Sequence, residues 1–410
     1  MASNVGAPDA PFLFQDLVSP VGVVDFLRDS VSKREPRLIP GERDKFERLF
    51  DWADLNRALL QHRVEPPRVR VERVGATPAE LTVVDYVPTP RGIAVPRINP
   101  DLLSQRLDEG CTLVFDAINE ASFQVGQLAQ DVARVFAARG QTNLYASFGE
   151  TPGFSPHWDS RDVFAVQVEG EKSWKVFRPH RVDPLYRDFH DREAEPGELW
   201  WEGTLSQGDV LFVPRGWWHE VRSIGTPSLH LTVGADPVTG LDYLSWIIDR
   251  LRNFDVFRAE LPKENISEGR SAEDALRAVL DEVWEDCSVQ AFLDDRRSER
   301  SGRSSFSLPY SVDTVKAIPN WNARVQFSVN QPKFEKSDSS VLITANGRQY
   351  TVAESLGEVL EGLIDQRCES FGLLATEVAN TAGISEADAS AVLVALVRQG
   401  LLTVDEHAGL

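Results

Sequence analysis

A histidine and an aspartate two positions apart are the residues of this 410-residue sequence whose spacing first suggests chemistry. They are His157 and Asp159, which follow Gly153-Phe-Ser-Pro. Residues two apart in an extended strand point to the same side, so this imidazole and this carboxylate can face one point. Two histidines and one carboxylate on one face of a metal are typical of non-haem Fe(II) oxygenases, which suggests a third ligand elsewhere.

The predicted third ligand is His219. Gly208-Asp209 predict a turn, and the apolar residues 210–213 predict a buried strand. The sequence Pro214-Arg-Gly216 then ends that strand and directs the following histidine inward. The order of glycine, proline, glycine and histidine here resembles the second cupin motif. The first motif is His-x-Asp instead of His-x-His, and this departure favours the 2-oxoglutarate oxygenases over the general cupins.

Residues 162–179 contain two alternating apolar runs around Glu169-Gly170, which predict a β-hairpin. Together with the two motifs, this segment resembles the JmjC oxygenases, and within them the ribosomal oxygenases, which hydroxylate ribosomal proteins. The resemblance implies that Lys172 holds the distal carboxylate of 2-oxoglutarate. It also implies pocket positions for three further residues: Asn143, Tyr145 and Ser228. Its specific motifs lie in residues 143–232.

Other histidines lack ligand spacing. A lone histidine is more often a surface or a satisfied core residue than a metal ligand, and His230 is assigned a structural role because the triad is already complete. The remaining histidines are predicted to lie on the surface: His62, His180, His190 and His407. Lys172 by itself would be a solvated lysine, and the pocket residues Asn143, Tyr145 and Ser228 could instead satisfy buried backbone groups.

Composition limits the class of protein. The net charge of −20 argues against a general binder of nucleic acids or anionic membranes, and it is compatible with a basic partner. Three distant cysteines form neither a metal motif nor a disulfide framework, which favours a reducing compartment. We expect no signal peptide, no membrane span and a cytoplasmic location.

The segments around the motifs predict further domains. Residues 1–238 are assigned to the catalytic domain with its lead-in, including an amphipathic helix over 122–136. Within it, residues 181–210 carry three arginines against eight Asp and Glu, a local charge of −5. This insert is either a solvated loop with aromatic anchors or an acidic rim that attracts a basic peptide.

Residues 239–300 have helical apolar stripes, and the family resemblance implies that this region forms a homodimer. Residues 301–335 are assigned to a linker. Residues 336–410 predict a winged-helix-like domain, in which Asn346-Gly347 is a type I′ hairpin signal. Its last predicted helix carries too few basic residues for binding to DNA.

The expected fold is a mostly β core with helices, a double-stranded β-helix of the JmjC and cupin kind. The expected function is hydroxylation of a protein side chain with Fe(II), 2-oxoglutarate and O2. In it, His157, Asp159 and His219 bind the metal. Three alternatives stay open: a natural-product precursor peptide as substrate, a JmjC-type demethylase, and a catalytically silent cupin scaffold.

Overall fold

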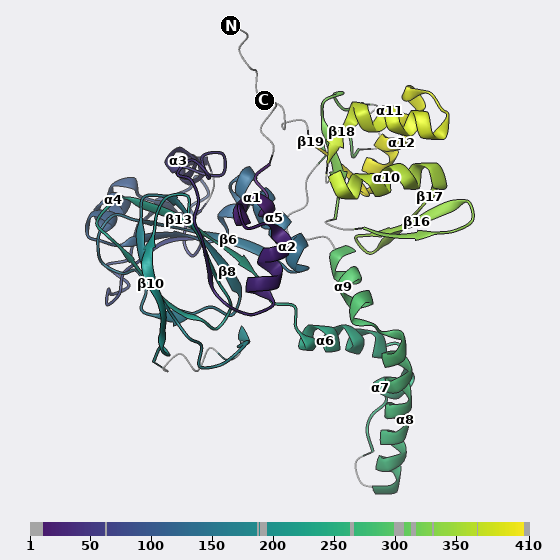
Figure 1. Cartoon of the computed structure of the whole chain (residues 1–410), viewed down its shortest axis with the longest axis horizontal. Helices are drawn as coiled ribbons and strands as arrows, with labels where there is room; N and C mark the ends of the chain where they lie inside the picture. Colours follow the sequence, from purple (N-terminus) through teal and green to yellow (C-terminus); the bar gives the residue numbers. More distant parts are fainter. Residues whose placement is uncertain are drawn as a thin grey trace. The chain divides into compact units, whose positions relative to one another are not determined.

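Figure 1 shows the computed structural model of the chain. It describes residues 11–61, 64–186, 188, 195–262, 266–298, 307–312, 317–329, 332–366 and 368–405. His62, His190, Glu193 and His407 lie outside these residues. The chain divides between Pro237 and Val238 into two compact units, and each is treated by itself below. Among the described residues, no helix combines the length and the apolar character needed to cross a membrane.

The first unit contains two antiparallel sheets with a buried apolar core. The larger sheet has seven strands in the order β1-β11-β8-β13-β6-β5-β2, and the smaller has four in the order β10-β9-β12-β7. The bounds in the larger sheet are β1 Arg37–Ile39, β2 Val69–Glu72, β5 Thr112–Phe115, β6 Gly140–Ser147, β8 Asp162–Glu169, β11 Val210–Val213 and β13 Ser228–Ala235. Those in the smaller sheet are β7 His157–Trp158, β9 Lys172–Phe177, β10 Leu199–Leu205 and β12 Trp218–Ser223. This JmjC- and cupin-like core confirms the predicted mostly β fold.

The predicted hairpin over 162–179 is wrong, although both of its strands exist. Strand β8 pairs with β11 and β13 in the larger sheet, whereas β9 pairs with β10 and β12 in the smaller one. Gly170 lies between them with φ +65°, and a Cβ atom there would lie 2.1 Å from the carbonyl oxygen of Pro227. The glycine therefore carries the chain from one sheet to the other instead of turning it back in the same sheet.

Helices and a small ribbon complete the first unit. Helix α5 (Phe123–Phe136) begins at Ser122, whose side chain accepts from Val125 N. Its buried residues Leu128 and Val132 belong to the same apolar core as Phe164 of β8, so it covers the larger sheet. The other helices are α1 Phe14–Val18, α2 Val23–Phe26, a π-helical turn Leu27–Val31, α3 Trp52–Gln61, α4 Pro100–Asp108 and a 3-10 turn Ile118–Glu120. The ribbon pairs β3 Val84–Pro88 with β4 Ala94–Ile98.

The second unit begins with helices. They are α6 Gly240–Leu251, α7 Asp255–Arg258, α8 Ile266–Asp286 and α9 Val289–Ser298. Thr239 starts α6 with a capping box, since its hydroxyl accepts from Asp242 N and the Asp242 carboxylate accepts from Thr239 N. Ile247 and Val283 pack in a small core of their own. The helices after the barrel were predicted, and α9 ends at Ser298, inside the predicted bounds of 239–300.

The remainder of the second unit contains three helices and two small sheets. The helices are α10 Glu354–Gln366, α11 Phe371–Ala382 and α12 Glu386–Gln399. One sheet has the order β18-β14-β19, and the other has the order β15-β16-β17. Their strands are β14 Arg324–Phe327, β15 Lys333–Lys336, β16 Ser340–Ala345, β17 Arg348–Ala353, β18 Glu369–Ser370 and β19 Leu402–Asp405.

Two expectations about this part can be compared with the strands. The hairpin at Asn346-Gly347 is confirmed, because β16 and β17 pair on either side of it and both residues have positive φ, 56° and 68°. The assignment of 301–335 to a linker is wrong where strands occur. Strand β14 lies wholly within it and pairs with β19, and β15 starts within it.

Candidate active site between the two sheets

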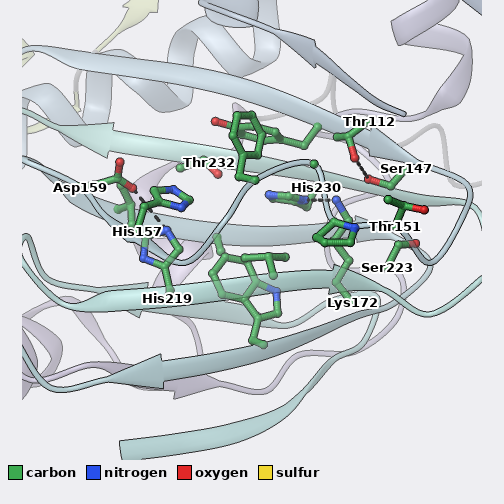
Figure 2. Close-up of a pocket in the computed structure, with 18 residues that line it drawn as sticks. Thr112, Ser147, Thr151, His157, Asp159, Lys172, His219, Ser223, His230 and Thr232 are labelled. Atoms are coloured by element: carbon green, nitrogen blue, oxygen red, sulfur yellow. Dashed lines mark hydrogen bonds and ion pairs between the residues drawn. The ribbon is translucent and has the colours of Figure 1, made fainter. Parts of the chain in front are cut away.

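The three predicted ligands lie together. His157 is on β7, Asp159 directly follows that strand, and His219 is on β12, where it pairs in register with His157. One possible ligand atom from each of the three lies within 4.8 Å of the other two. His219 Nε2 is 3.7 Å from Asp159 Oδ2, which is too long for a hydrogen bond but within the span of two metal–ligand bonds of about 2.1 Å each. These side chains therefore face a common point, as Figure 2 shows.

Backbone contacts orient both imidazoles. His157 Nδ1 lies 2.9 Å from the carbonyl oxygen of Ser155, and His219 Nδ1 lies 3.3 Å from that of Trp217. A carbonyl can only accept, so each Nδ1 carries the proton and each Nε2 keeps a free lone pair. Burial, with the neighbouring His157 as a second cause, lowers the pKa of His219 to about 4. His219 is therefore neutral near pH 7, the state that binds a metal ion, and the donor set fits a divalent transition metal.

The triad lines one end of a pocket between the two sheets. The pocket contains roughly 740 Å³ of empty space, part of it open to solvent. Its walls come from both sheets: Tyr145, His230 and Thr232 from the larger, and Lys172, Trp174 and Ser223 from the smaller. Alternate residues of a strand point to one side, which explains why β9 contributes Lys172 and Trp174 and β13 contributes His230 and Thr232. A pocket with apolar walls and a few convergent polar groups suits a small-molecule cosubstrate.

Lys172 lies toward the other end of the pocket from the triad, as Figure 2 shows. Its Nζ is 2.8 Å from His230 Nδ1, and both side chains are buried. Burial lowers the pKa of Lys172 to about 7. Burial, followed by the charge of Lys172, lowers the pKa of His230 well below its usual range. The pocket thus holds one buried cation whose charge no described carboxylate in contact neutralises, which suits an anionic ligand.

Several polar groups of the pocket have no partner of their own. Among the described residues, the Ser223 hydroxyl and the Trp174 indole N–H are buried and make no hydrogen bond. Thr112 and Ser147 share one hydrogen bond of 3.0 Å near Lys172 (Figure 2). Buried polar atoms are usually satisfied, so unpartnered ones that line a pocket favour a bound polar ligand.

The three further pocket residues implied by the family resemblance lie in different places. Tyr145 lines the pocket, and burial raises its pKa to about 12. Asn143 is outside the pocket wall. Its Oδ1 accepts hydrogen bonds from Ala117 N and from Gln141 Nε2, each with a length of 3.0 Å. Ser228 is also outside the wall, fully buried, and accepts from Gln167 Nε2 over 2.9 Å. A direct cosubstrate contact therefore stays a prediction for Tyr145, while the structure gives Asn143 and Ser228 structural contacts.

His230 is the residue that sequence reasoning missed. It was assigned a structural role because the triad was complete, yet it lies on the pocket wall in contact with Lys172. Its place two residues after Ser228, a predicted pocket residue, was the available signal. The register of β13 with β8 shifts between Leu229 and His230, and only His230 lies on the wall. His180 is exposed, as predicted.

The comparisons agree with this geometry. Residues 118–243 match the model of the JmjC domain family. The chain is 29% identical over 222 residues to the bifunctional lysine-specific demethylase and histidyl-hydroxylase NO66 of Drosophila pseudoobscura pseudoobscura, an alignment that covers 53% of this chain and 22% of that protein. It is 28% identical over 229 residues to ribosomal oxygenase 1 of Danio rerio, covering 54% and 40%. The chain thus spans well under two thirds of these relatives.

Among solved structures, the chain is similar to YcfD, a ribosomal oxygenase from Escherichia coli in complex with cobalt and 2-oxoglutarate. The TM-score is 0.54 with 17% identity, and the match covers 93% of this chain and 97% of that one. At this identity the likeness is one of fold. A cupin-like barrel with a His-Asp-His triad defines the class. Within that class, residues 118–243 match the JmjC domain family, and the predicted resemblance to the ribosomal oxygenases is confirmed.

Proposed function

We propose that this protein is an Fe(II)- and 2-oxoglutarate-dependent oxygenase that hydroxylates a side chain of a protein, with a ribosomal protein as the candidate substrate. The observation that carries the proposal is the combination of His157, Asp159 and His219 with the buried cation Lys172 in one pocket. The names of the relatives, histidyl-hydroxylase and ribosomal oxygenase, support the reaction class. The cobalt and 2-oxoglutarate in the YcfD complex support the cofactors.

Each pocket residue has a role in this reaction. Iron and 2-oxoglutarate would supply the oxidation of a C–H bond by O2: one oxygen atom would go to the substrate and the other to the succinate that forms when 2-oxoglutarate loses CO2. His157, Asp159 and His219 hold the metal on one face, so its other face stays open. Lys172 pairs with the distal carboxylate and orients the cosubstrate. The apolar side chains Val163 and Ala165 of β8 limit the access of water to the pocket.

A demethylase is a second candidate, because the same oxidation at an N-methyl carbon releases the methyl group. The relatives of the NO66 type support it, since their printed name includes both a lysine-specific demethylase and a histidyl-hydroxylase. Mass spectrometry separates the two outcomes: hydroxylation adds one oxygen atom, about 16 Da, and demethylation removes one methylene equivalent, about 14 Da.

The decisive experiment compares candidate host proteins from cells with and without the active enzyme. We expect a gain of one oxygen atom on a side chain of a ribosomal protein, together with 2-oxoglutarate turnover by the purified protein. The Asp159→Ala variant serves as the inactive control. Iron-loaded protein that neither binds nor turns over 2-oxoglutarate would leave only the catalytically silent scaffold.

We further propose that the helical region forms a homodimer. On α6, Leu241, Leu244 and Ile248 are spaced along one helical face and are 59%, 42% and 53% exposed. Exposed apolar residues aligned on a helix favour association with a second copy. The test is the mass in solution of Leu244→Glu with Ile248→Glu, for which we expect a monomer. Leu60→Glu, at an isolated and 84% exposed leucine of α3, is the control that keeps the wild-type mass.

We also propose that residues 336–410 form a winged-helix-like domain that does not bind DNA. Helices α11 and α12 followed by β19, beside the hairpin β16–β17, support this architecture. The first turn of α12 contains Glu386 and Asp388, and its last turn contains a single basic residue, Arg398. A helix with this charge distribution lacks the clustered cations that phosphate contacts need. A cytoplasmic location stays a prediction.

We propose, finally, that the substrate is a basic segment attracted by the protein's net charge of −20. The acidic insert, residues 181–210, supports a basic substrate less than its local charge of −5 suggested. Asp183 pairs with Arg34 and Arg215, and Asp188 pairs with Arg181. Glu198 is the better probe, because its side chain is 84% exposed and its ion pair with Arg178 is long, at 4.0 Å. We expect Glu198→Lys to raise the KM for the substrate at low ionic strength only. If KM depends on ionic strength in the same way for the variant and the wild type, the charge of Glu198 does not attract the substrate.

A further inference from the structure

The contact between Lys172 and His230 has a defined direction. The two atoms, Nζ and Nδ1, are 2.8 Å apart, and the residues are only 3% and 5% exposed. An ammonium can only donate, so Nδ1 of a neutral imidazole must accept. The low pKa of His230 agrees with a neutral ring. Among the described residues, Nδ1 of His230 is therefore the one hydrogen-bond acceptor of Lys172.

The imidazole of His230 is held in place by aromatic neighbours. Tyr145 stacks on it, with ring centroids 4.9 Å apart and planes 9° from parallel. The indole of Trp174 meets it edge-on at 6.0 Å and 75°. Rings fixed in this way leave the acceptor atom little freedom to turn. The hydrogen bond to this fixed ring therefore restricts the orientation of the Lys172 ammonium.

The groups left over around the ammonium match a carboxylate. Lys172 has three N–H donors and uses one on His230, so two remain. Ser223, which is paired with Lys172 in the register of β12 and β9, brings a buried hydroxyl that has no partner. A carboxylate only accepts hydrogen bonds, and its two oxygens can accept from both remaining N–H groups and from the Ser223 hydroxyl.

We propose that His230 is a positioning residue for the cosubstrate: its hydrogen bond favours the ammonium form of Lys172 and aims it at the distal carboxylate of 2-oxoglutarate. This inference rests on the proposed function and deepens it, because it assigns the selection of an anionic cosubstrate to a pair of residues. His230 itself touches Lys172 and not the reacting atoms.

The pair predicts how cosubstrate binding depends on pH. Burial lowers the pKa of Lys172 to about 7, so above pH 7 the protein must take up a proton to bind a carboxylate. Binding then weakens about tenfold per pH unit above 7. The other titratable groups facing the pair are Tyr145 on β6, which stacks on His230, and His219 on β12, which acts electrostatically on His230. Loss of the His230 acceptor destabilises the ammonium further, which moves this dependence to lower pH.

The test uses two substitutions of similar size with opposite hydrogen-bonding capacity. His230→Asn keeps an acceptor oxygen close to the position of Nδ1, whereas His230→Leu removes it. Calorimetry measures the Kd of 2-oxoglutarate for the full-length, Co(II)-loaded protein from pH 6 to pH 9. We expect His230→Leu to weaken binding about 10- to 100-fold at pH 7, the range for a hydrogen bond to a charged group. The pH above which Kd rises should fall by about one unit, with His230→Asn near wild type.

The outcomes separate the two levels of the proposal. If the wild type binds 2-oxoglutarate but His230→Leu keeps its affinity and pH profile, the positioning role is overturned and the proposed function stands. If the Co(II)-loaded wild type does not bind 2-oxoglutarate, the proposed function fails first. The melting temperature and Co(II) affinity of both variants serve as checks on folding, because the proposal expects neither the metal site nor the fold to depend on this hydrogen bond. A loss of binding in both variants alike would indicate sensitivity to ring volume and would also contradict the proposal.

Discussion

The backbone N–H of Gly216 donates a hydrogen bond to the carbonyl oxygen of Asp159 over 2.9 Å. This contact joins the two sequence motifs directly, because Asp159 is one candidate ligand and Gly216 lies three residues before His219. Gly216 has φ +85°, and a Cβ atom on it would lie 2.6 Å from Pro184 Cδ and 3.0 Å from the carbonyl oxygen of Arg181. The glycine is therefore required for the close approach that brings the ligands to one point.

Gly216→Ala should weaken metal binding more than its effect on stability alone would suggest. The left-handed backbone and the close contact displace the turn, and a shift of residues that orient ligands costs about 10- to 100-fold in metal affinity. We expect a loss of about 1–3 kcal/mol in the free energy of unfolding. Titration with Co(II) measures the affinity. The control is Gly75→Ala, where φ is +79° but no atom lies within 4 Å of the added Cβ. Equal Co(II) affinity in both variants would contradict the link.

Asp159→Ala should abolish tight metal binding while leaving the protein folded. Asp159 is one of three donors, and the loss of a direct ligand exceeds the roughly 10- to 100-fold penalty of losing an outer contact. Its partly exposed carboxylate contributes little to the core. Co(II) absorption and the melting temperature are the measurements, with His180→Ala, an exposed histidine, as the control. Unchanged Co(II) affinity in Asp159→Ala would remove it from the ligand set.

Local patterns predicted the strands correctly and their partners incorrectly. The alternation in 162–179 defines two strands whatever sheet they join, so β8 and β9 were expected within a few residues of their bounds. A glycine between two strands is equally compatible with a hairpin and with a crossing between sheets. What distinguishes them here is the approach of Gly170 to Pro227, a residue more than fifty positions away. Such tertiary contacts leave no mark on the local pattern.

The candidate ligands were predictable because their spacing is itself the chemical signal, as with His157 and Asp159. The contacts of the other pocket residues were harder to predict from the sequence. Asn143 and Tyr145 are on one face of β6, but only Tyr145 reaches the pocket, since Asn143 accepts the N–H of Ala117, which has φ 53°. A side chain that satisfies a left-handed residue far along the chain cannot be distinguished in sequence from one that binds a ligand.

Asp162→Ala should be among the most destabilising single changes in the barrel. Its Oδ2 accepts from Arg34 Nη1 over 2.8 Å, and its Oδ1 accepts from Arg215 N over 2.9 Å. Without Asp162, Arg34 keeps only the more exposed Asp183 as a partner, and the N–H of Arg215 loses its acceptor. We therefore expect a loss of about 3 kcal/mol, the low end of the range for removing one partner of a largely buried ion pair. Chemical denaturation measures the loss. Asp183→Ala is the control: that carboxylate also contacts Arg34 but is 42% exposed, so we expect about 1 kcal/mol or less. Similar losses in the two variants would mean that burial does not set the cost.

Lys172→Met should abolish tight binding of 2-oxoglutarate and at the same time stabilise the ligand-free protein. Removing one partner of a buried charge pair costs about 2–5 kcal/mol of binding free energy. In the free protein, however, burial lowers the pKa of Lys172 from 10.5 to about 7. At about 1.4 kcal/mol per pKa unit, keeping this lysine in the folded state costs on the order of 4 kcal/mol near neutral pH. The variant avoids that cost, so its melting temperature should rise by several degrees.

The sign of the pH dependence provides the sharper test of the same change. A lysine whose pKa is lowered on folding destabilises the folded state fully below about pH 7, and the penalty disappears as pH rises toward 10.5, where the unfolded chain also loses the proton. The stability gap between Lys172→Met and wild type should therefore be largest at or below pH 7 and close by about pH 10. Lys175→Met, on the same strand with its side chain paired to Glu202 and 39% exposed, should show no such gap. A gap that is constant between pH 6 and pH 10 would mean that Lys172 keeps an ordinary pKa and that the buried cation is already balanced in the empty pocket.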